Sequence, residues 1–165
     1  MIRPVLPEDG EELAALYLAN REFLAPFEPV RPPEFFTADG QRERLQRQLD
    51  GETYPFAIVD NGTIAGTINL FGIVRESLQS GVIGYWVDGA RKGRGLATGA
   101  VGEILAYAFG ELDLHRVEAA TVVDNVPSQR VLEKSGFERI GLARRYLRID
   151  DEWRDFFLFQ RLADD

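Results

Sequence analysis

Three local patterns follow one another without a gap in the middle of the chain, and they constrain its fold more than any other feature. Residues 81–87 (GVIGYWV) are rich in strand-forming side chains, residues 88–95 (DGARKGRG) contain three glycines, and residues 96–112 repeat apolar side chains at helical spacing. A strand that enters a helix through a glycine-rich turn exposes the unpaired N–H groups of the first helical turn. The pattern therefore predicts a crossover unit with an accessible helix N-terminus.

The flanking sequence extends this unit into a mixed sheet. Asp60-Asn61-Gly62 separates two runs of strand formers, residues 54–59 and 63–74, and is a strong signal for an antiparallel hairpin. Further strands are expected at residues 2–6, 115–122, 137–149 and 152–162, and further helices at residues 7–20, 38–50 and 125–135. The fold class is therefore α/β (α+β, mixed sheet) in the order β-α-α-β-β-β-α-β-α-β-β, in one domain of residues 1–165.

Half of the eight prolines lie within residues 26–33, which excludes a continuous helix there. The same segment holds Phe27 and is followed by Phe35 and Phe36. Two interpretations stay open: these aromatic rings line a substrate cleft, or they close the edge of the core. The helix expected at residues 38–50 is assigned a polar face, formed by Gln41, Arg42, Arg44 and Gln48.

Charge narrows the choice of partners. The 165 residues carry 19 basic and 27 acidic side chains, a formal net charge of −8, which disfavours nucleic acid and anionic membranes and favours a cationic partner. The chain has no cysteine and one histidine, His115, so that thiolate chemistry and multi-histidine metal sites are excluded. No apolar stretch approaches the roughly 18 residues that span a bilayer. We therefore expect a cytoplasmic protein, monomeric or homodimeric.

The loop at residues 88–98 concentrates positive charge in this acidic chain. Arg91, Lys92 and Arg94 lie among its glycines, and a helix N-terminus with nearby cations favours a phosphate or pyrophosphate group. The loop is not a P-loop, because no Gly-Lys-Ser/Thr follows, and it lacks the three-glycine spacing of a dinucleotide fingerprint. A tight turn with solvated basic side chains would need the same glycines, so that both interpretations stay open on the loop alone.

Four motifs together point to a family. They are Gly84-Tyr85-Trp86-Val87, the loop Lys92-Gly93-Arg94-Gly95-Leu96-Ala97, Asn125-x-x-Ser128, and Leu132-Glu133-Lys134-Ser135-Gly136-Phe137. In this combination the chain resembles the GNAT superfamily of N-acetyltransferases. Residues 20–31, 146–150 and 153–155 also look like segments of the ribosomal-protein-alanine N-acetyltransferases, so that the resemblance covers nearly the whole chain.

The resemblance implies a site for acetyl-CoA and no metal. The strand at residues 85–87 would part from its parallel neighbour, the loop amides would hold the pyrophosphate, and Asn125 would bond the pantetheine arm. The implied cofactor residues are Trp86, Val87, Lys92, Gly93, Arg94, Gly95, Leu96, Ala97, Thr98 and Asn125. Lys92 departs from the Gln or Arg with which this loop usually starts in the family.

The resemblance also implies direct attack of an amine on the thioester, in line with the absence of a cysteine nucleophile. The backbone N–H of Val87 would stabilise the oxyanion, and the hydroxyl of Ser128 would protonate the thiolate, unless Ser128 only caps its helix. No general base is evident, because Leu147 occupies the place of a glutamate found in some relatives. Glu118 is a candidate base by strand parity, and Glu28 in the proline-rich segment is another.

These inferences lead to one expected function and two alternatives. We expect acetyl-CoA-dependent transfer of an acetyl group to a primary amine, in particular to the N-terminal α-amine of a protein. The first alternative is an acetyltransferase for a small polycationic amine, such as an aminoglycoside or a polyamine. The second is a non-catalytic acetyl-CoA-binding module, which the missing base suggests.

Overall fold

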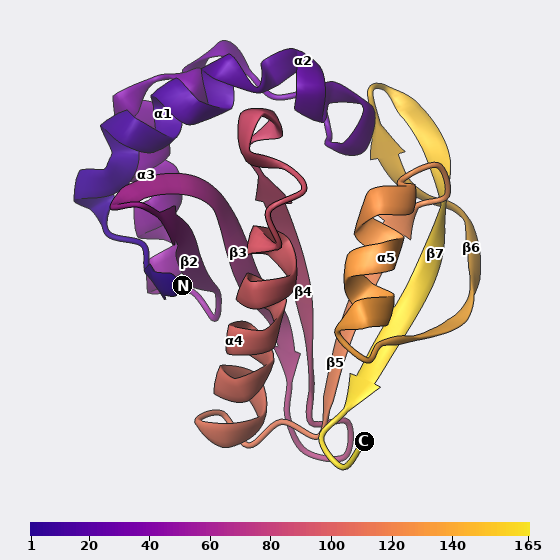
Figure 1. The fold of residues 1–165 in the computed structure, drawn as a ribbon. Coiled ribbons are helices and arrows are strands. Elements are labelled where there is room, and N and C mark those ends of the chain that lie inside the picture. Colours follow the sequence, from indigo (N-terminus) through magenta and orange to yellow (C-terminus); the bar gives the residue numbers. More distant parts are fainter.

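The computed structural model describes residues 1–165, and all seven strands belong to one mixed sheet in the order β1-β2-β3-β4-β5-β7-β6 (Figure 1). The strands are β1 (Ile2–Pro4), β2 (Tyr54–Asp60), β3 (Thr63–Val74), β4 (Ser80–Val87), β5 (Arg116–Val122), β6 (Glu138–Ile149) and β7 (Glu152–Leu162). The α-helices are α1 (Gly10–Ala19), α2 (Arg21–Leu24), α3 (Ala38–Asp50), α4 (Leu96–Gly110) and α5 (Val126–Lys134). The expected fold class and element order are confirmed, and the short α2 is an addition to them.

One pair of neighbouring strands is parallel, and it is the pair that α4 connects. Strands β1 to β4 pair in antiparallel fashion, as do β5 with β7 and β7 with β6, whereas β4 and β5 are parallel. A helix between two parallel strands is the usual crossover connection. The hairpin predicted at Asp60-Asn61-Gly62 is also present: Asn61 and Gly62 both have positive φ, 50° and 80°, as a tight two-residue hairpin turn requires.

Helices cover both faces of the sheet and bury two apolar clusters. On one face α4 and α5 pack on the strands, and Ile104, Leu132 and Phe159 lie in that cluster. On the other face α1 and α3 pack on the strands through Leu13, Leu45 and neighbours. In Figure 1 the N-terminal segment arches over one end of the sheet, from α1 to α2 and on to the tip of the β6–β7 hairpin. This end of the sheet carries the candidate site.

The proline-rich segment forms short 3-10 turns between its prolines, at Ala25–Phe27 and Pro33–Phe36, and no continuous helix. Phe35 is buried and meets the ring of Tyr17 at 4.7 Å between centroids. One expectation for the neighbouring helix α3 was wrong. Gln41, assigned above to a polar outer face, is fully buried, because its amide nitrogen donates to the carbonyl oxygen of Phe35 at 2.6 Å. A buried polar side chain is tolerated where it is hydrogen-bonded in this way.

No helix of the structure is both long and apolar enough to cross a bilayer.

Candidate active site

The parallel strands β4 and β5 separate near the middle of the sheet. They pair only from Ser80 with Arg116 to Val82 with Glu118, although both strands continue beyond that point. The backbone N–H of Asp88 donates to Ala65 of β3 at 2.7 Å. Since backbone groups alternate in direction along a strand, the N–H of Val87 points away from β3, toward the side from which β5 has parted. The structure thus leaves a strand edge with free backbone groups inside the sheet.

The loop that follows β4 presents free backbone amides. None of the N–H groups of residues 92–98 donates a hydrogen bond within the chain. Gly93 and Gly95 have φ of 77° and 76°, a conformation that other residues adopt only with strain, and a Cβ at either position would meet no atom within 4 Å. Gly95 directly precedes α4, so that the helix N-terminus opens onto this empty space. These features fit a diphosphate group, which accepts several N–H hydrogen bonds and is favoured at the positive end of a helix.

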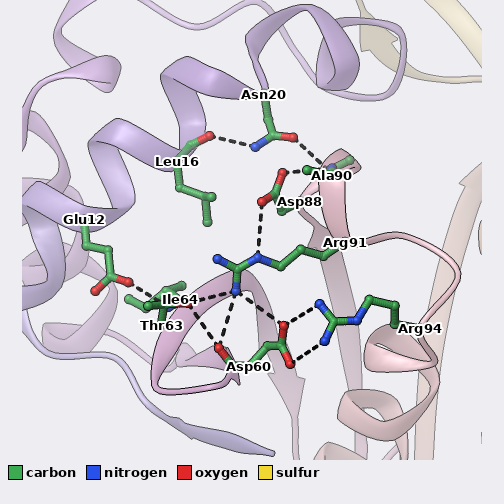
Figure 2. Close-up of polar contacts among 11 residues, drawn as sticks. Glu12, Leu16, Asn20, Asp60, Thr63, Ile64, Asp88, Ala90, Arg91 and Arg94 are labelled. Carbon is green, nitrogen blue, oxygen red and sulfur yellow. Dashed lines mark hydrogen bonds and ion pairs between the residues drawn. The ribbon is translucent and has the colours of Figure 1, made fainter.

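The arginines of this loop are less available than the sequence suggested. Arg94 makes two hydrogen bonds to the carboxylate of Asp60, at 2.8 and 3.2 Å, and Arg91 lies 3.6 Å from the same carboxylate (Figure 2). Arg91 also pairs with Asp88 at 3.5 Å. The expected local positive field is therefore largely offset by two carboxylates, and Lys92 is the one loop cation without an ion pair.

Trp86 has a packing role. Its indole is buried on the α1–α3 face, and its Nε1 donates to the hydroxyl of Tyr17 at 3.0 Å. Its backbone pairs with Thr67 of β3, on the side of β4 that faces away from the parting. Neither its side chain nor its N–H is thus directed at the position proposed for the cofactor.

The first turn of α5 brings a serine and a tyrosine together. Asn125, not Ser128, caps this helix, because the Asn125 Oδ1 accepts the N–H of Ser128 at 3.3 Å. The hydroxyl of Ser128 is 2.8 Å from the hydroxyl of Tyr85 on β4, which also lies 3.2 Å from the Ser128 carbonyl oxygen. Burial raises the pKa of Tyr85 to about 12, although its hydrogen bond with Ser128 acts in the opposite direction. The Ser128 hydroxyl is therefore free of helix capping and has a neutral phenol as its partner.

A cavity of about 180 Å³ lies beneath the arch of the N-terminal segment. Glu28 lines it, and burial raises the pKa of this carboxyl, against the opposing effect of Arg31 and Arg44. Arg31 Nε is 3.9 Å from the Glu28 carboxylate and donates no hydrogen bond within the chain. Asp150, in the turn between β6 and β7, closes another side of the cavity. A partly buried carboxyl of raised pKa in a cavity is a candidate to accept a proton.

Two of the three phenylalanines considered above, Phe35 and Phe36, line this cavity. Phe35 belongs to the buried core and also lines the cavity, and Phe36 lines it without being fully buried. Guanidinium groups lie over these rings: Arg31 is 4.7 Å from the centroid of Phe35, and Arg21 is 4.7 Å from that of Phe36. The cavity wall is therefore made of stacked arginine and phenylalanine side chains.

Glu118 has a different environment from Glu28. It stands at the last paired position of β4 and β5, and its carboxylate accepts a hydrogen bond from Arg116 Nε at 3.0 Å. Its side chain is 38% exposed. This partly exposed carboxylate is therefore already engaged by a guanidinium.

Sequence reasoning missed the partners of two candidate residues. It did not connect the Ser128 hydroxyl to Tyr85, and it did not connect Arg91 and Arg94 to Asp60. The sequence Asp60-Asn61-Gly62 indicated a hairpin turn and nothing more. No neighbouring residue identified Asp60 as a partner of Arg91 and Arg94, which lie more than thirty positions away. The structure holds no group of three or more His, Cys, Asp or Glu side chains placed to bind a metal ion.

This geometry agrees with what is known of similar proteins. Residues 1–138 match the acetyltransferase (GNAT) domain, and the chain belongs to this family of N-acetyltransferases. Over 160 residues, 93% of this chain and 88% of the relative, it is 41% identical to the probable N-acetyltransferase YjcK of Bacillus subtilis. Over 164 residues, 96% of this chain and 84% of the relative, it is 32% identical to the [ribosomal protein uS5]-alanine N-acetyltransferase of Escherichia coli.

The fold matches a solved structure of the family with its cofactor. Mycobacterium smegmatis RimJ in complex with CoA-disulfide superposes with a TM-score of 0.94 at 32% identity, over 99% of this chain and 81% of that one. The protein is therefore an acetyltransferase with acetyl-CoA as its acetyl donor, and the alternative of a non-catalytic module is set aside.

Proposed function

We propose that this acetyltransferase acts on the N-terminal α-amine of a protein, in the manner of the ribosomal-protein-alanine enzymes. The observation that carries the proposal is the cavity under the N-terminal arch, which is lined by the partly buried Glu28 and by Asp150 of the β6–β7 turn. The 32% identity to the E. coli uS5-alanine enzyme over nearly the whole chain supports the same acceptor class. We further propose that the protein acts in the cytoplasm.

We assign the donor side of the site to backbone groups. The N–H groups of residues 92–98 would hold the pyrophosphate. The side-chain oxygen of Asn125 caps α5, and its side-chain nitrogen would donate a hydrogen bond to the pantetheine arm. Acetyl-CoA supplies the activated acetyl thioester. The N–H of Val87, which has no hydrogen-bond partner on β5, would bind the thioester carbonyl oxygen and stabilise negative charge on it.

Proton transfers are assigned to two side chains. Attack requires a neutral amine, so that a proton must first leave the acceptor ammonium, and Glu28 is the proposed base for it. As the amine nitrogen bonds to the acetyl carbon, the carbon–sulfur bond breaks and the CoA sulfur takes a proton from the Ser128 hydroxyl. The second proton that the nitrogen loses on becoming an amide returns the Ser128 oxygen to its hydroxyl form. Tyr85, which remains protonated, is placed to support that transfer through its 2.8 Å contact with Ser128. We prefer Glu28 to Glu118 as the base because the Glu118 carboxylate is hydrogen-bonded to Arg116 and more exposed than that of Glu28.

The choice of an α-amine also follows from acid strength. An α-amino group has a pKa near 7.7–8.0 and a lysine near 10.4, so that removing the proton from the α-amine at neutral pH costs about 3.4 kcal/mol less. A single carboxyl, that of Glu28, can therefore remove a proton from an α-amine more easily than from a lysine side chain. This favours a protein N-terminus over a lysine side chain as the acceptor.

A small polycationic acceptor fits the cavity less well. Glu28 and Asp150 supply two negative charges to its wall, but Arg21 and Arg31 supply two positive ones. A polyamine or an aminoglycoside carries several ammonium groups and needs uncompensated carboxylates nearby. A peptide N-terminus brings one ammonium and several carbonyl oxygens, and the carbonyl oxygens can accept from the arginines.

The deciding experiment measures release of free CoA from acetyl-CoA with a panel of acceptors. The panel contains peptides that begin with alanine or other residues, the same peptides with a blocked N-terminus, a polyamine and an aminoglycoside. We expect turnover with free N-terminal peptides and none with the blocked ones. Faster turnover of the polyamine or the aminoglycoside than of every peptide would refute the proposed acceptor class.

A further inference from the structure

The carboxylate of Asp60 contacts both Arg91 and Arg94, the two arginines that lie on either side of Gly93 in the loop between β4 and α4. The carboxylate, whose side chain is 13% exposed, contacts Arg94 at 2.8 Å and Arg91 at 3.6 Å. Arg91 also donates to Thr63 Oγ1 at 2.9 Å. Figure 2 shows both guanidinium groups directed at this one carboxylate from the loop between β4 and α4. Both ends of segment 91–94 are thereby linked to the side chain of Asp60 in the β2–β3 hairpin.

The hairpin corner is well suited to hold the loop. Asn61 and Gly62 form a tight turn with positive φ at both positions, and Thr63 Oγ1 donates to the Asp60 carbonyl oxygen at 3.1 Å. Such a turn has little freedom to move relative to the two strands that it joins. Asp60 is thus a fixed point, whereas the loop itself contains Gly93 and Gly95.

The two glycines make the conformation of this loop depend on contacts with residues outside it. Glycine has the largest conformational freedom of any residue, and Gly93 and Gly95 lie among the amides that would bind the pyrophosphate. Without a restraint, the cost of ordering these amides would be subtracted from the free energy of cofactor binding. Two arginines anchored on one carboxylate remove part of that cost in advance.

We propose that Asp60 is a positioning residue for the cofactor loop, which holds Arg91 and Arg94 so that the amides of residues 92–98 are ordered before acetyl-CoA binds. The inference rests on the assignment of these amides to the cofactor. It distinguishes the two arginines as well. Arg91 has Asp60, Asp88 and Thr63 as partners and is a purely structural anchor, while Arg94 has Asp60 alone and is 49% exposed.

The opposite effect of Asp60 has to be weighed. Its negative charge also weakens the attraction between the loop and an anionic cofactor, so that its removal would tighten binding if electrostatics dominated. Solvent screens exposed charges over about 8 Å at physiological ionic strength. The two hydrogen bonds from Arg94 to the largely buried Asp60 carboxylate are screened less than the longer-range effect of this charge on a phosphate, and we therefore expect anchoring to dominate.

The test is the affinity of Asp60→Asn for CoA, measured by titration calorimetry at two salt concentrations, together with KM for acetyl-CoA and kcat. We expect Kd and KM to rise about tenfold at both salt concentrations, with kcat at saturating acetyl-CoA unchanged; a tenfold rise corresponds to about 1.4 kcal/mol. The matched control is Asp39→Asn, which removes a carboxylate from an exposed ion pair with Arg42 on α3 and should leave Kd unchanged.

A second variant keeps the inference testable if Asp60→Asn does not fold. Arg91→Gln removes the anchor with three partners and is expected to raise Kd by a similar factor. The double variant should be little worse than either single one, because both act through the same contact. Unchanged or tighter CoA binding in Asp60→Asn and in Arg91→Gln would overturn the inference. Because CoA binding involves no acceptor, an error in the proposed acceptor class would not affect this result.

Discussion

The hydroxyl of Tyr85 on β4 lies 2.8 Å from the hydroxyl of Ser128 on α5, so that two side chains reach across the point where β4 and β5 have separated. Tyr85 is on the strand whose free edge is assigned to the cofactor, and Ser128 is in the turn capped by Asn125. The contact therefore connects the proposed proton donor with the strand that carries the proposed oxyanion site.

Removal of the Ser128 hydroxyl should slow catalysis. In Ser128→Ala we expect kcat to fall by about 10²-fold, the lower end of what a general acid contributes, with CoA affinity and stability near the wild type because Asn125 caps the helix. In Tyr85→Phe the serine keeps its hydroxyl but loses its partner, and a smaller fall in kcat is expected. Because the pKa of Tyr85 is about 12, its ionisation should not reduce the rate below about pH 11. Steady-state kinetics across pH check these expectations, and an unchanged kcat in Ser128→Ala would remove its catalytic role.

Substitution of Gly95 should affect cofactor binding beyond its effect on stability. Gly95 has a φ of 76°, and a side chain there is strained by about 1–2 kcal/mol. It would also project into the open space in front of α4. Gly72, with a φ of 61° and only the Val82 side chain within 4 Å of an added Cβ, has the same strain in β3. We expect Gly95→Ala and Gly72→Ala to lose similar stability in urea unfolding, but only Gly95→Ala to lose CoA affinity. Equal affinities in the two variants would contradict the assignment of the loop.

Replacement of Glu28 by glutamine should lower the rate of acetyl transfer and, above the folded-state pKa of Glu28, raise stability. Burial raises its pKa above the usual 4.5, so that the folded protein holds this proton more tightly than the unfolded chain. Stability from this group is thus present below pH 4.5 and is lost as pH rises through the folded-state pKa. In Glu28→Gln that loss is absent, while kcat/KM should fall by about 10²-fold.

The measurement is urea unfolding at several pH values beside acetyl transfer to a peptide. Glu118→Gln is the control, and it should retain the activity of the wild type, because Glu118 is partly exposed and paired with Arg116. A larger loss of activity in Glu118→Gln than in Glu28→Gln would reverse the assignment of the base.

Tyr17 should matter for stability and not for the cofactor. Its hydroxyl accepts the Trp86 Nε1 hydrogen bond, and both side chains are buried. Tyr17→Phe leaves a buried donor without a partner, which costs about 1–3 kcal/mol. Tyr54→Phe removes a hydroxyl that has no hydrogen bond and serves as the control. Thermal unfolding should separate the two variants. A weaker CoA affinity in Tyr17→Phe would restore a cofactor role to Trp86.

Local patterns were sufficient to predict most of the fold. The Asp60-Asn61-Gly62 turn, the glycine-rich entry to α4 and the helical spacing of α4 are determined by neighbouring residues, and they appear where they were expected. The parallel pairing of β4 with β5 followed from the helix between them. The parting of these strands was expected from the family resemblance, and the structure has it.

Other features depend on contacts between residues distant in the sequence. Gln41 has a polar side chain on a polar helix, and only the carbonyl of Phe35 makes it a buried residue. Arg91 and Arg94 look like free cations until β2 brings Asp60 to them. The cap of α5 is a local feature, but Asn125 and Ser128 both qualify for it by residue type, and the backbone conformation decides between them.

The short pairing between β4 and β5 has a thermodynamic consequence. Three residue pairs join one half of the sheet to the other, so that beyond Val82 the backbone groups of β4 that face β5 have no partner on that strand. Unpaired backbone groups in a protein interior raise its free energy. The fold is thus left incomplete at its centre, and a ligand that supplies the missing hydrogen bonds contributes to folding stability as well as to chemistry. Melting temperature and cofactor concentration are then linked quantities for this protein, and its resistance to unfolding depends on the metabolic supply of its own substrate.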